Sequence, residues 1–238
     1  MLPRSARRFV HVILAIVLFC SVVPCVLAEP VGSPASILKK KQWIFGLSGG
    51  GIFGRGMQGG SDINIYSIGH YRGYGLTDRI SAYLKLGVGW MSAADAISNL
   101  DQSMGANVMA SAQLKTRLWQ DKRQKWEWDG SLQYTYIHAR HRDNNEGLWK
   151  EWQGSTTVAR TMGRFTPYLG MKVSLADLQY TYRKGGRITQ QGKYKGENYV
   201  GPIFGTDIRI GQGEQVTFNV ETAYVNGPEL DLAVAYTF

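Results

Sequence analysis

The sequence has little cysteine, little histidine and no apolar run long enough for a spanning helix. Its two cysteines, Cys20 and Cys25, lie near the N-terminus, and only four histidines occur in 238 residues. If the N-terminal segment is removed, neither a disulfide nor a cysteine metal site can stabilise the rest of the chain. The apolar run at Phe9–Phe19 is shorter than the roughly 18 residues that a transmembrane helix requires.

The first 28 residues have the layout of a secretory signal peptide. Arg4, Arg7 and Arg8 precede the apolar run, and the small-residue site Val26–Ala28 follows it. We therefore expect cleavage after residue 28, with both cysteines lost. We further expect a periplasmic N-terminal linker at 29–40, rich in Pro, Ser and Lys, and a single domain at 41–238.

The formal net charge is +9, from 27 basic and 18 acidic residues. A basic balance suits an anionic surface such as the phosphates of lipopolysaccharide. A nucleic-acid function would require a recognisable binding motif, and the sequence has none. We therefore expect no nucleic-acid partner and no cofactor.

Apolar and polar residues alternate through most of the chain after residue 40. From Ile80 to Trp90, every second residue is apolar and most of those between are polar or glycine. The same period returns at 107–118, 126–136 and 216–224. A period of two predicts strands with one apolar and one polar face.

Charged residues occupy the polar face of several of these strands. Packing them in a dry core would cost several kcal/mol each unless all were paired. A wet or ion-paired lumen with the apolar face toward lipid is the more favourable arrangement. The expected lumen charge network comprises Lys85, Lys115, Arg117, Glu127, Asp129, Asp207, Arg209 and Glu221.

The alternation predicts an all-β, closed antiparallel transmembrane up-and-down β-barrel of about ten strands. The expected strands are 41–50, 62–75, 79–91, 105–118, 125–138, 150–160, 166–182, 197–210, 216–225 and 229–238. The strand at 150–160 alternates poorly, and the next changes parity between Leu175 and Leu178, which a bulge would explain. Eight or twelve strands fit the pattern as well. Short polar turns are expected in the periplasm, and longer loops outside the cell.

The last ten residues, ELDLAVAYTF, end on alternating apolar residues with a terminal aromatic. Asp231, Ala233, Tyr236 and Phe238 resemble the C-terminal assembly signal of outer-membrane β-barrel proteins, with Ala233 where the pattern prefers glycine. With the hairpin GYGLTDRISAYLKLGVGW, the chain resembles the small bacterial outer-membrane β-barrel domain proteins over 41–238. The resemblance implies localisation in the outer membrane, and recognition of the last strand by the barrel-assembly machinery.

Two loops carry candidate chemistry. In HARHRDNNE, His138 and His141 lie near Asp143, and Ser155 or Thr157 could approach from the next strand; this favours a solvated loop over an envelope enzyme. The loop RKGGRITQQGKYKGEN is a candidate anion-binding loop, because Arg and Lys bind phosphate through charge-assisted hydrogen bonds. Its basic residues are Arg183, Lys184, Arg187, Lys193 and Lys195. The glycine-rich stretch GGGIFGRGMQGG is expected to be a flexible surface loop.

The sequence therefore favours a monomeric, non-enzymatic outer-membrane barrel whose outer loops contact the envelope or other surfaces. Outer-membrane lipid and lipopolysaccharide are the expected partners. Two alternatives remain open: a narrow channel for small solutes or ions, and an envelope enzyme that acts on lipid A or peptides.

Overall fold

The structure is a computed structural model that describes residues 32–33, 37–58, 60–94, 101–140, 146–184, 187–196, 199–211 and 215–238. Within these residues the chain forms eleven β-strands. Their bounds are β1 Trp43–Met57, β2 Ser61–Gly75, β3 Ile80–Ala94, β4 Asp101–Asp121, β5 Trp126–Arg140, β6 Glu146–Arg160, β7 Phe165–Lys184, β8 Arg187–Lys195, β9 Val200–Ile210, β10 Val216–Tyr224 and β11 Pro228–Thr237. No helix in this part of the chain is long and apolar enough to cross a membrane.

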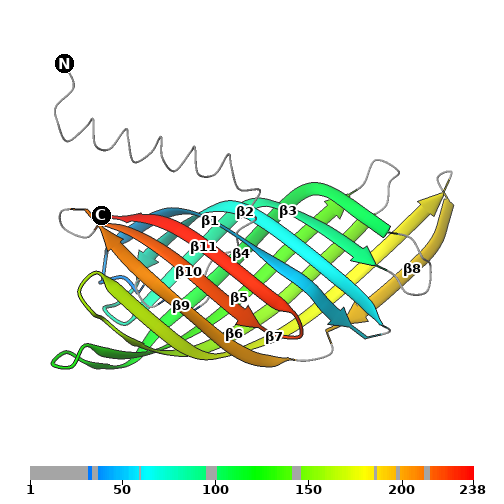
Figure 1. Ribbon diagram of the computed structural model, residues 1–238. Coiled ribbons are helices and arrows are strands. Elements are labelled where there is room, and N and C mark those ends of the chain that lie inside the picture. Colours follow the sequence, from blue (N-terminus) through cyan, green and yellow to red (C-terminus); the bar gives the residue numbers. More distant parts are fainter. Residues whose placement is uncertain are drawn as a thin grey trace, which may run out of the picture.

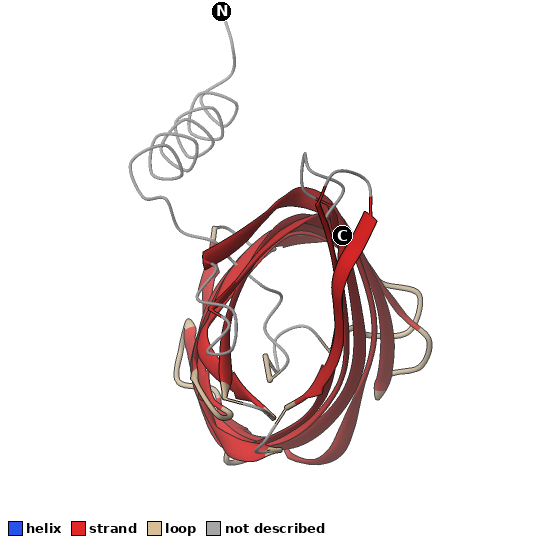
Figure 2. Ribbon diagram, turned by 90° about the vertical axis from the view of Figure 1, so that its right-hand side faces the viewer, coloured by secondary structure: helices blue, strands red, loops and turns tan. Residues whose placement is uncertain are grey.

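Ten of the strands close into an antiparallel barrel, as predicted. Each strand from β1 to β7 pairs with its neighbours in sequence, and β7 is followed in the ring by β9, β10 and β11. β11 pairs with β1 from Thr237 opposite Ile44 to Glu229 opposite Ile52, which closes the ring (Figure 2). Closure satisfies backbone groups that an open sheet edge would leave unpaired in hydrocarbon.

Trp43 and Phe238 lie together at one end of the barrel, which we call the terminal end; the opposite end is the loop end (Figure 1). The backbone N–H of each residue donates to the carbonyl of the other, at 3.1 and 3.0 Å. At the loop end the β10–β11 turn is tight, with Asn226 at φ 53° and Gly227 at φ 147°. A side chain at Gly227 would also meet the Phe53 carbonyl oxygen at 2.6 Å, so this turn requires glycine.

β8 lies outside the ring and pairs only with the loop-end part of β7. The first part of β7, up to Val173, pairs with β9, whereas Asp177–Lys184 pairs with β8. β8 ends beside β1, where the Gln58 N–H donates to the Lys195 carbonyl at 2.8 Å. The segment expected to be an outer loop therefore contains a strand that extends the wall at the loop end.

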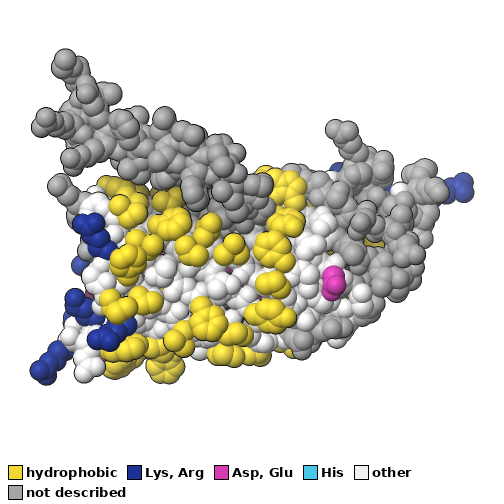
Figure 3. Space-filling view, viewed as in Figure 1, with side chains coloured by type: hydrophobic (Ala, Val, Ile, Leu, Met, Phe, Trp, Pro, Cys, Tyr) yellow, Lys and Arg dark blue, Asp and Glu magenta, His cyan; other side chains and the backbone are white. Residues whose placement is uncertain are grey.

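The outward face of the barrel is apolar and the inward face is largely polar. In β3 the side chains of Leu84 and Leu86 are 55% and 43% exposed, whereas Lys85 between them is 2% exposed. Apolar side chains gather over the middle of the barrel wall (Figure 3). Exposing such a belt to water costs about 25 cal/mol of free energy for each Å² of apolar surface. The belt is therefore favourable where it contacts lipid.

The structure corrects the end of one strand and accounts for the apparent parity change in another. The glycine-rich stretch expected to be a flexible loop is strand as far as Met57, because β11 pairs with it up to Ile52 and β2 pairs with it from Arg55. The bulge that would explain the parity change between Leu175 and Leu178 does not occur. The β6–β7 register is regular, with Leu175 outward and Leu178 buried inside.

The apparent parity change in β7 has a different physical cause. The interior of the barrel is polar in the middle but apolar near the loop end, so the apolar residues of β7 move from the outward to the inward face without a break in the strand. Leu178 packs inside with Met57, Ile63, Met109 and Trp149.

Candidate functional site: the barrel lumen

The charged residues predicted to form the lumen charge network lie on the inward side of their strands. Most are buried, although Arg117 and Arg209, both near the terminal end, are only partly so. Near the terminal end, Arg117 on β4 pairs with Glu127 on β5 at 2.7 Å and approaches Asp129 at 3.7 Å. The buried members are Lys85, Lys115, Glu127, Asp129, Asp207, Glu221 and Asp231.

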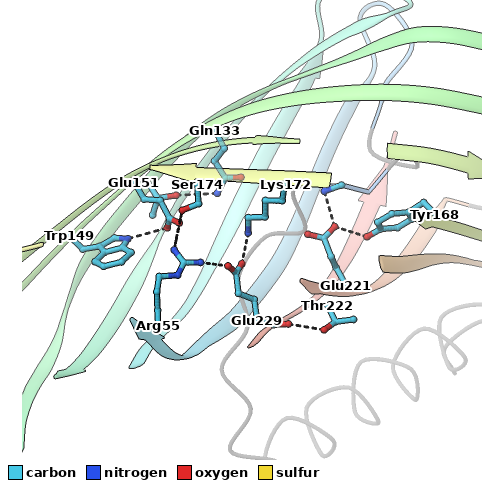
Figure 4. A network of polar contacts seen from close by, with 12 residues as sticks. Arg55, Gln133, Trp149, Glu151, Tyr168, Lys172, Ser174, Glu221, Thr222 and Glu229 are labelled. Carbon is cyan, nitrogen blue, oxygen red and sulfur yellow. Dashed lines mark hydrogen bonds and ion pairs between the residues drawn. The ribbon is translucent and has the colours of Figure 1, made fainter. Parts of the chain in front are cut away.

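A set of buried ion pairs crosses the middle of the lumen; we call it the cross-brace, defined as Arg55, Glu151, Lys172 and Glu229 (Figure 4). Arg55 on β1 donates to Glu151 on β6 at 2.5 Å and to Glu229 on β11. Lys172 on β7 pairs with the other oxygen of Glu229. All four side chains are at most 2% exposed.

The cross-brace joins opposite walls of the barrel. β1 and β6 are five positions apart in the ring of ten strands, so the Arg55–Glu151 pair spans the lumen. Ser174 Oγ and Trp149 Nε1 also donate to Glu151, at 2.5 and 3.2 Å. These hydrogen bonds fill the acceptor positions of the carboxylate and fix its orientation, as a buried ion pair requires.

A second buried cluster lies between the cross-brace and the terminal end. Tyr168 Oη donates to Glu221 at 2.7 Å, and Asn219 Nδ2 donates to Tyr168 Oη at 3.0 Å and to Asp207 at 2.5 Å. Space for the Tyr168 ring comes from Gly205 on β9, where a side chain would lie 2.2 Å from the ring.

Part of the segment expected to be a linker contacts this second cluster. Gly32 N–H donates to Glu221 at 2.8 Å, and Ser33 Oγ donates to Asp207 at 2.8 Å. Both residues are buried, as are Ile37 and Leu38 nearer the terminal end. The described residues between 32 and 38 are therefore held inside the barrel.

Toward the loop end the lumen becomes apolar. Met57, Ile63, Met91, Met109 and Trp149 belong to one buried cluster there. A cavity of about 40 Å³ separates this cluster from the charged middle of the lumen, with lining residues that include Lys85 and Glu151. Since one water needs about 10–15 Å³ of such volume, the cavity has room for a few waters.

The basic residues of the candidate anion-binding loop lie on the β7–β8 hairpin. Lys193 and Lys195 lie on one exposed face of β8, opposite Gln179 and Asp177, while Tyr194 between them stacks on Tyr180 at 5.5 Å. Arg187 is exposed as well, but the register between β7 and β8 shifts between it and these two lysines. Arg183 is half-buried on β7. Lys184 is the last residue of β7, opposite Arg187. Because Tyr194 packs against the apolar cluster of the lumen, the basic face points outward.

The described members of the candidate catalytic arrangement, His138, Ser155 and Thr157, do not lie close together. His138 pairs with Leu148 on the outward side of β5, whereas Ser155 pairs with Ser131 seven ladder positions away, about 24 Å along the strands. Thr157 is farther still and points inward. The expected approach of Ser155 or Thr157 is thus wrong, because the long β5–β6 ladder separates them from His138. His141 and Asp143 lie outside the described residues, among which no metal-binding group of side chains occurs.

The four residues that resemble a C-terminal assembly signal lie on both faces of β11 and its end. Asp231 and Ala233 are buried on the inward side, and Ala233 packs in a cluster with Tyr71 and Tyr83. Tyr236 and Phe238 are 39% and 64% exposed on the outward side, with ring centroids 6.0 Å apart. The aromatic pair therefore contributes to the outer surface at the terminal end.

A basic rim at the terminal end was not expected from the sequence. Lysine and arginine side chains gather there (Figure 3), and two arginines lie over aromatic rings: Arg160 over Trp126 at 5.4 Å and Arg72 over Phe45 at 5.7 Å. Its exposed members are Lys39, Lys40, Lys41, Arg72, Arg79, Lys122, Arg123, Lys125, Arg160 and Arg164. They come from separate turns and strand ends, so only closure of the barrel brings them together.

Comparisons with known proteins return distant structures only. No family model matches the chain, and no curated protein matches it in sequence. The outer membrane protease OmpT from Escherichia coli is 11% identical, with a TM-score of 0.42, over 83% of this chain and 94% of that one. The outer membrane protein AlkL is 13% identical, with a TM-score of 0.40, over 89% and 97%. An outer membrane channel from Pseudomonas putida F1 is 14% identical, with a TM-score of 0.41, over 87% and 99%.

Proposed function

We propose that this protein is a non-enzymatic integral barrel of the bacterial outer membrane with a closed lumen, which acts on the envelope through its outer surface. The cross-brace carries the proposal. It joins opposite walls through side chains at most 2% exposed, so an open aqueous path would require these ion pairs to separate. The size of the barrel agrees, because open aqueous channels occur in barrels of about 16 strands.

Planar bilayer recording tests the closed lumen directly. The full mature chain is expected to insert without resolvable conductance steps, because the buried ion pairs of the cross-brace join opposite walls of the lumen. Steady steps from the wild type would overturn the proposal. If Lys115→Ala also changed the size of those steps, a narrow channel lined by the lumen charges would be the better function.

We propose further that the outward basic face of the β7–β8 hairpin binds lipopolysaccharide phosphates. The outward side of β7 is apolar from Leu169 to Leu175 and becomes polar from Asp177 onward. The basic face of β8 begins at that level, opposite Asp177. Cations just beyond the apolar belt are well placed for charge-assisted hydrogen bonds to phosphate.

The test replaces Lys193 and Lys195, the two lysines of the outward face, together with glutamine. Affinity for lipopolysaccharide should fall by about tenfold or more, since each hydrogen bond to a charged group contributes about 1.5–3 kcal/mol. The matched control changes Lys122 and Lys125 at the terminal end, and should bind as the wild type does. Equal loss in both variants, or equal binding of dephosphorylated lipopolysaccharide by the wild type, would contradict a specific phosphate site.

An envelope enzyme centred on His138 is the alternative with less support. His138 points away from the polar interior, and the Ser155 and Thr157 hydroxyls are distant from it. Turnover of lipid A or a peptide by the wild type, lost in His138→Ala, would overturn the non-enzymatic proposal.

A further inference from the structure

The residues at 32–33 contact the lumen as an extended peptide contacts a receptor. The Gly32 N–H donates to Glu221, and the Gly32 carbonyl accepts from Thr157 Oγ1 at 3.2 Å. The Ser33 hydroxyl donates to Asp207, and the Ser33 carbonyl accepts from Lys115 Nζ at 3.3 Å. The donors and acceptors of the wall come from β4, β6, β9 and β10.

The fit at Gly32 is tight on three sides. A side chain there would lie 2.9 Å from Ile203 Cδ1, 3.0 Å from Glu221 Oε2 and 3.0 Å from Thr157 Cγ2. These atoms are the ends of side chains on three different strands, so a side chain at position 32 would require all three to shift. The site therefore favours glycine at this position, and it forms hydrogen bonds with the backbone groups of residues 32 and 33.

The segment is also fixed where it meets the first strand. The Leu38 N–H donates to Ser81 Oγ at 2.8 Å, and the Lys41 N–H donates to the Gly75 carbonyl at 2.9 Å. Gly75 is needed for this contact, because a side chain there would lie 1.9 Å from the Lys39 carbonyl oxygen. Leu38 itself is 2% exposed and packs with Tyr71 and Tyr83.

We propose that the terminal half of the lumen is a binding site for an extended peptide containing a Gly-Ser pair, and that the chain occupies it with its own residues 32–33, anchored nearer the terminal end by residues 37–38. Tethering by a short connection gives an effective concentration on the order of millimolar. A site with only modest affinity for the free peptide would therefore be filled by the tethered segment in nearly every molecule.

The experiment vacates the site in the full mature chain and then supplies the segment as a separate peptide. Gly32→Trp should expel the segment, because the larger side chain meets Ile203, Glu221 and Thr157. A labelled peptide EPVGSPASIL, residues 29–38, should then bind saturably to this variant and about tenfold or more weakly to the wild type, whose site is occupied in cis. The same peptide with tryptophan in place of its glycine is the control and should not bind.

A second pair of variants keeps the proposal falsifiable if Gly32→Trp fails to fold. The mature chain is expected to contain no cysteine, so Ser33→Cys with Asp207→Cys should be joined by a short bifunctional thiol reagent in the otherwise native chain, since Ser33 Oγ and Asp207 Oδ1 are 2.8 Å apart. The control pairs Ser33→Cys with Thr206→Cys, the neighbouring outward position on β9, and should not be cross-linked.

Two results would overturn the peptide site. One is equal binding of the natural and the tryptophan peptide by the vacated barrel; the other is equal cross-linking at positions 206 and 207. Neither experiment measures conductance, so both are independent of the test of the closed lumen. A barrel that binds the peptide but also conducts would contradict only the closed lumen, and a closed barrel without peptide binding would contradict only this inference.

Discussion

Arg55 is expected to contribute strongly to stability, because it compensates two buried carboxylates. Arg55→Ala would leave Glu151 without its partner and Glu229 with Lys172 alone. Breaking a buried ion pair by removing one partner is destabilising by about 3–5 kcal/mol. Urea unfolding in lipid vesicles should show a loss of this size, whereas Arg72→Ala, on the exposed rim, should lose little. A near-neutral Arg55→Ala would mean that the cross-brace is not formed.

The residues of the cross-brace were missed in the sequence for identifiable physical reasons. Arg55 lies in a glycine-rich stretch typical of a loop, and Glu229 lies at a tight turn. Glu151 and Lys172 lie on strands whose apolar pattern is weak or changes face. The lumen charges of β3, β4 and β5 could be predicted, because there a strict period of two separates lipid-facing from inward residues.

At the scale of elements, the strands follow the period of two where the interior is polar. The apolar interior near the loop end gives β7 apolar residues on both faces, and this produced its apparent change of parity, although its boundaries were predicted closely. The end of β1 was missed because its second half is rich in glycine. β8 could not be separated from a loop, because its pattern, RITQQGKYK, has few apolar residues and its partner is only the end of β7.

A lipid-facing substitution tests which face of a strand is outside. Leu132 on β5 is 51% exposed and lies midway between Trp128 and Tyr136, the aromatic residues toward either end of the strand. Leu132→Arg should lower the unfolding free energy in vesicles by about 2–4 kcal/mol, the range for a cation at the bilayer midplane. Leu132→Ala is the control for lost packing. If Arg were tolerated as well as Ala, Leu132 would face water.

At the scale of the whole molecule, closure produces features that no single segment carries. The cross-brace spans opposite walls, the basic rim collects residues from many turns, and the peptide site draws on four strands. The sequence could predict the ten-stranded barrel, because closure follows from strand count and amphipathicity. It could not predict which inward residues meet across the lumen, because this depends on the ring order and on the register between strands.

The position of Phe238 links the end of the chain to closure of the barrel. Its backbone exchanges two hydrogen bonds with Trp43, the first residue of β1, and its ring stacks on Tyr236. We expect deletion of Phe238 to lower the amount of assembled barrel, because it removes both the closing hydrogen bonds and the terminal aromatic residue of the resembled assembly signal. Deletion of Lys122 in the β4–β5 turn is the control for a one-residue loss.

Fractionation of cells that express the full chain, followed by gel electrophoresis with and without boiling, tests the transmembrane barrel most directly. We predict a band in the outer-membrane fraction that migrates differently when unboiled, because a closed barrel stays folded in detergent, and we predict that this band is lost when Phe238 is deleted. A soluble periplasmic protein with no change on boiling would contradict the lipid-facing exterior.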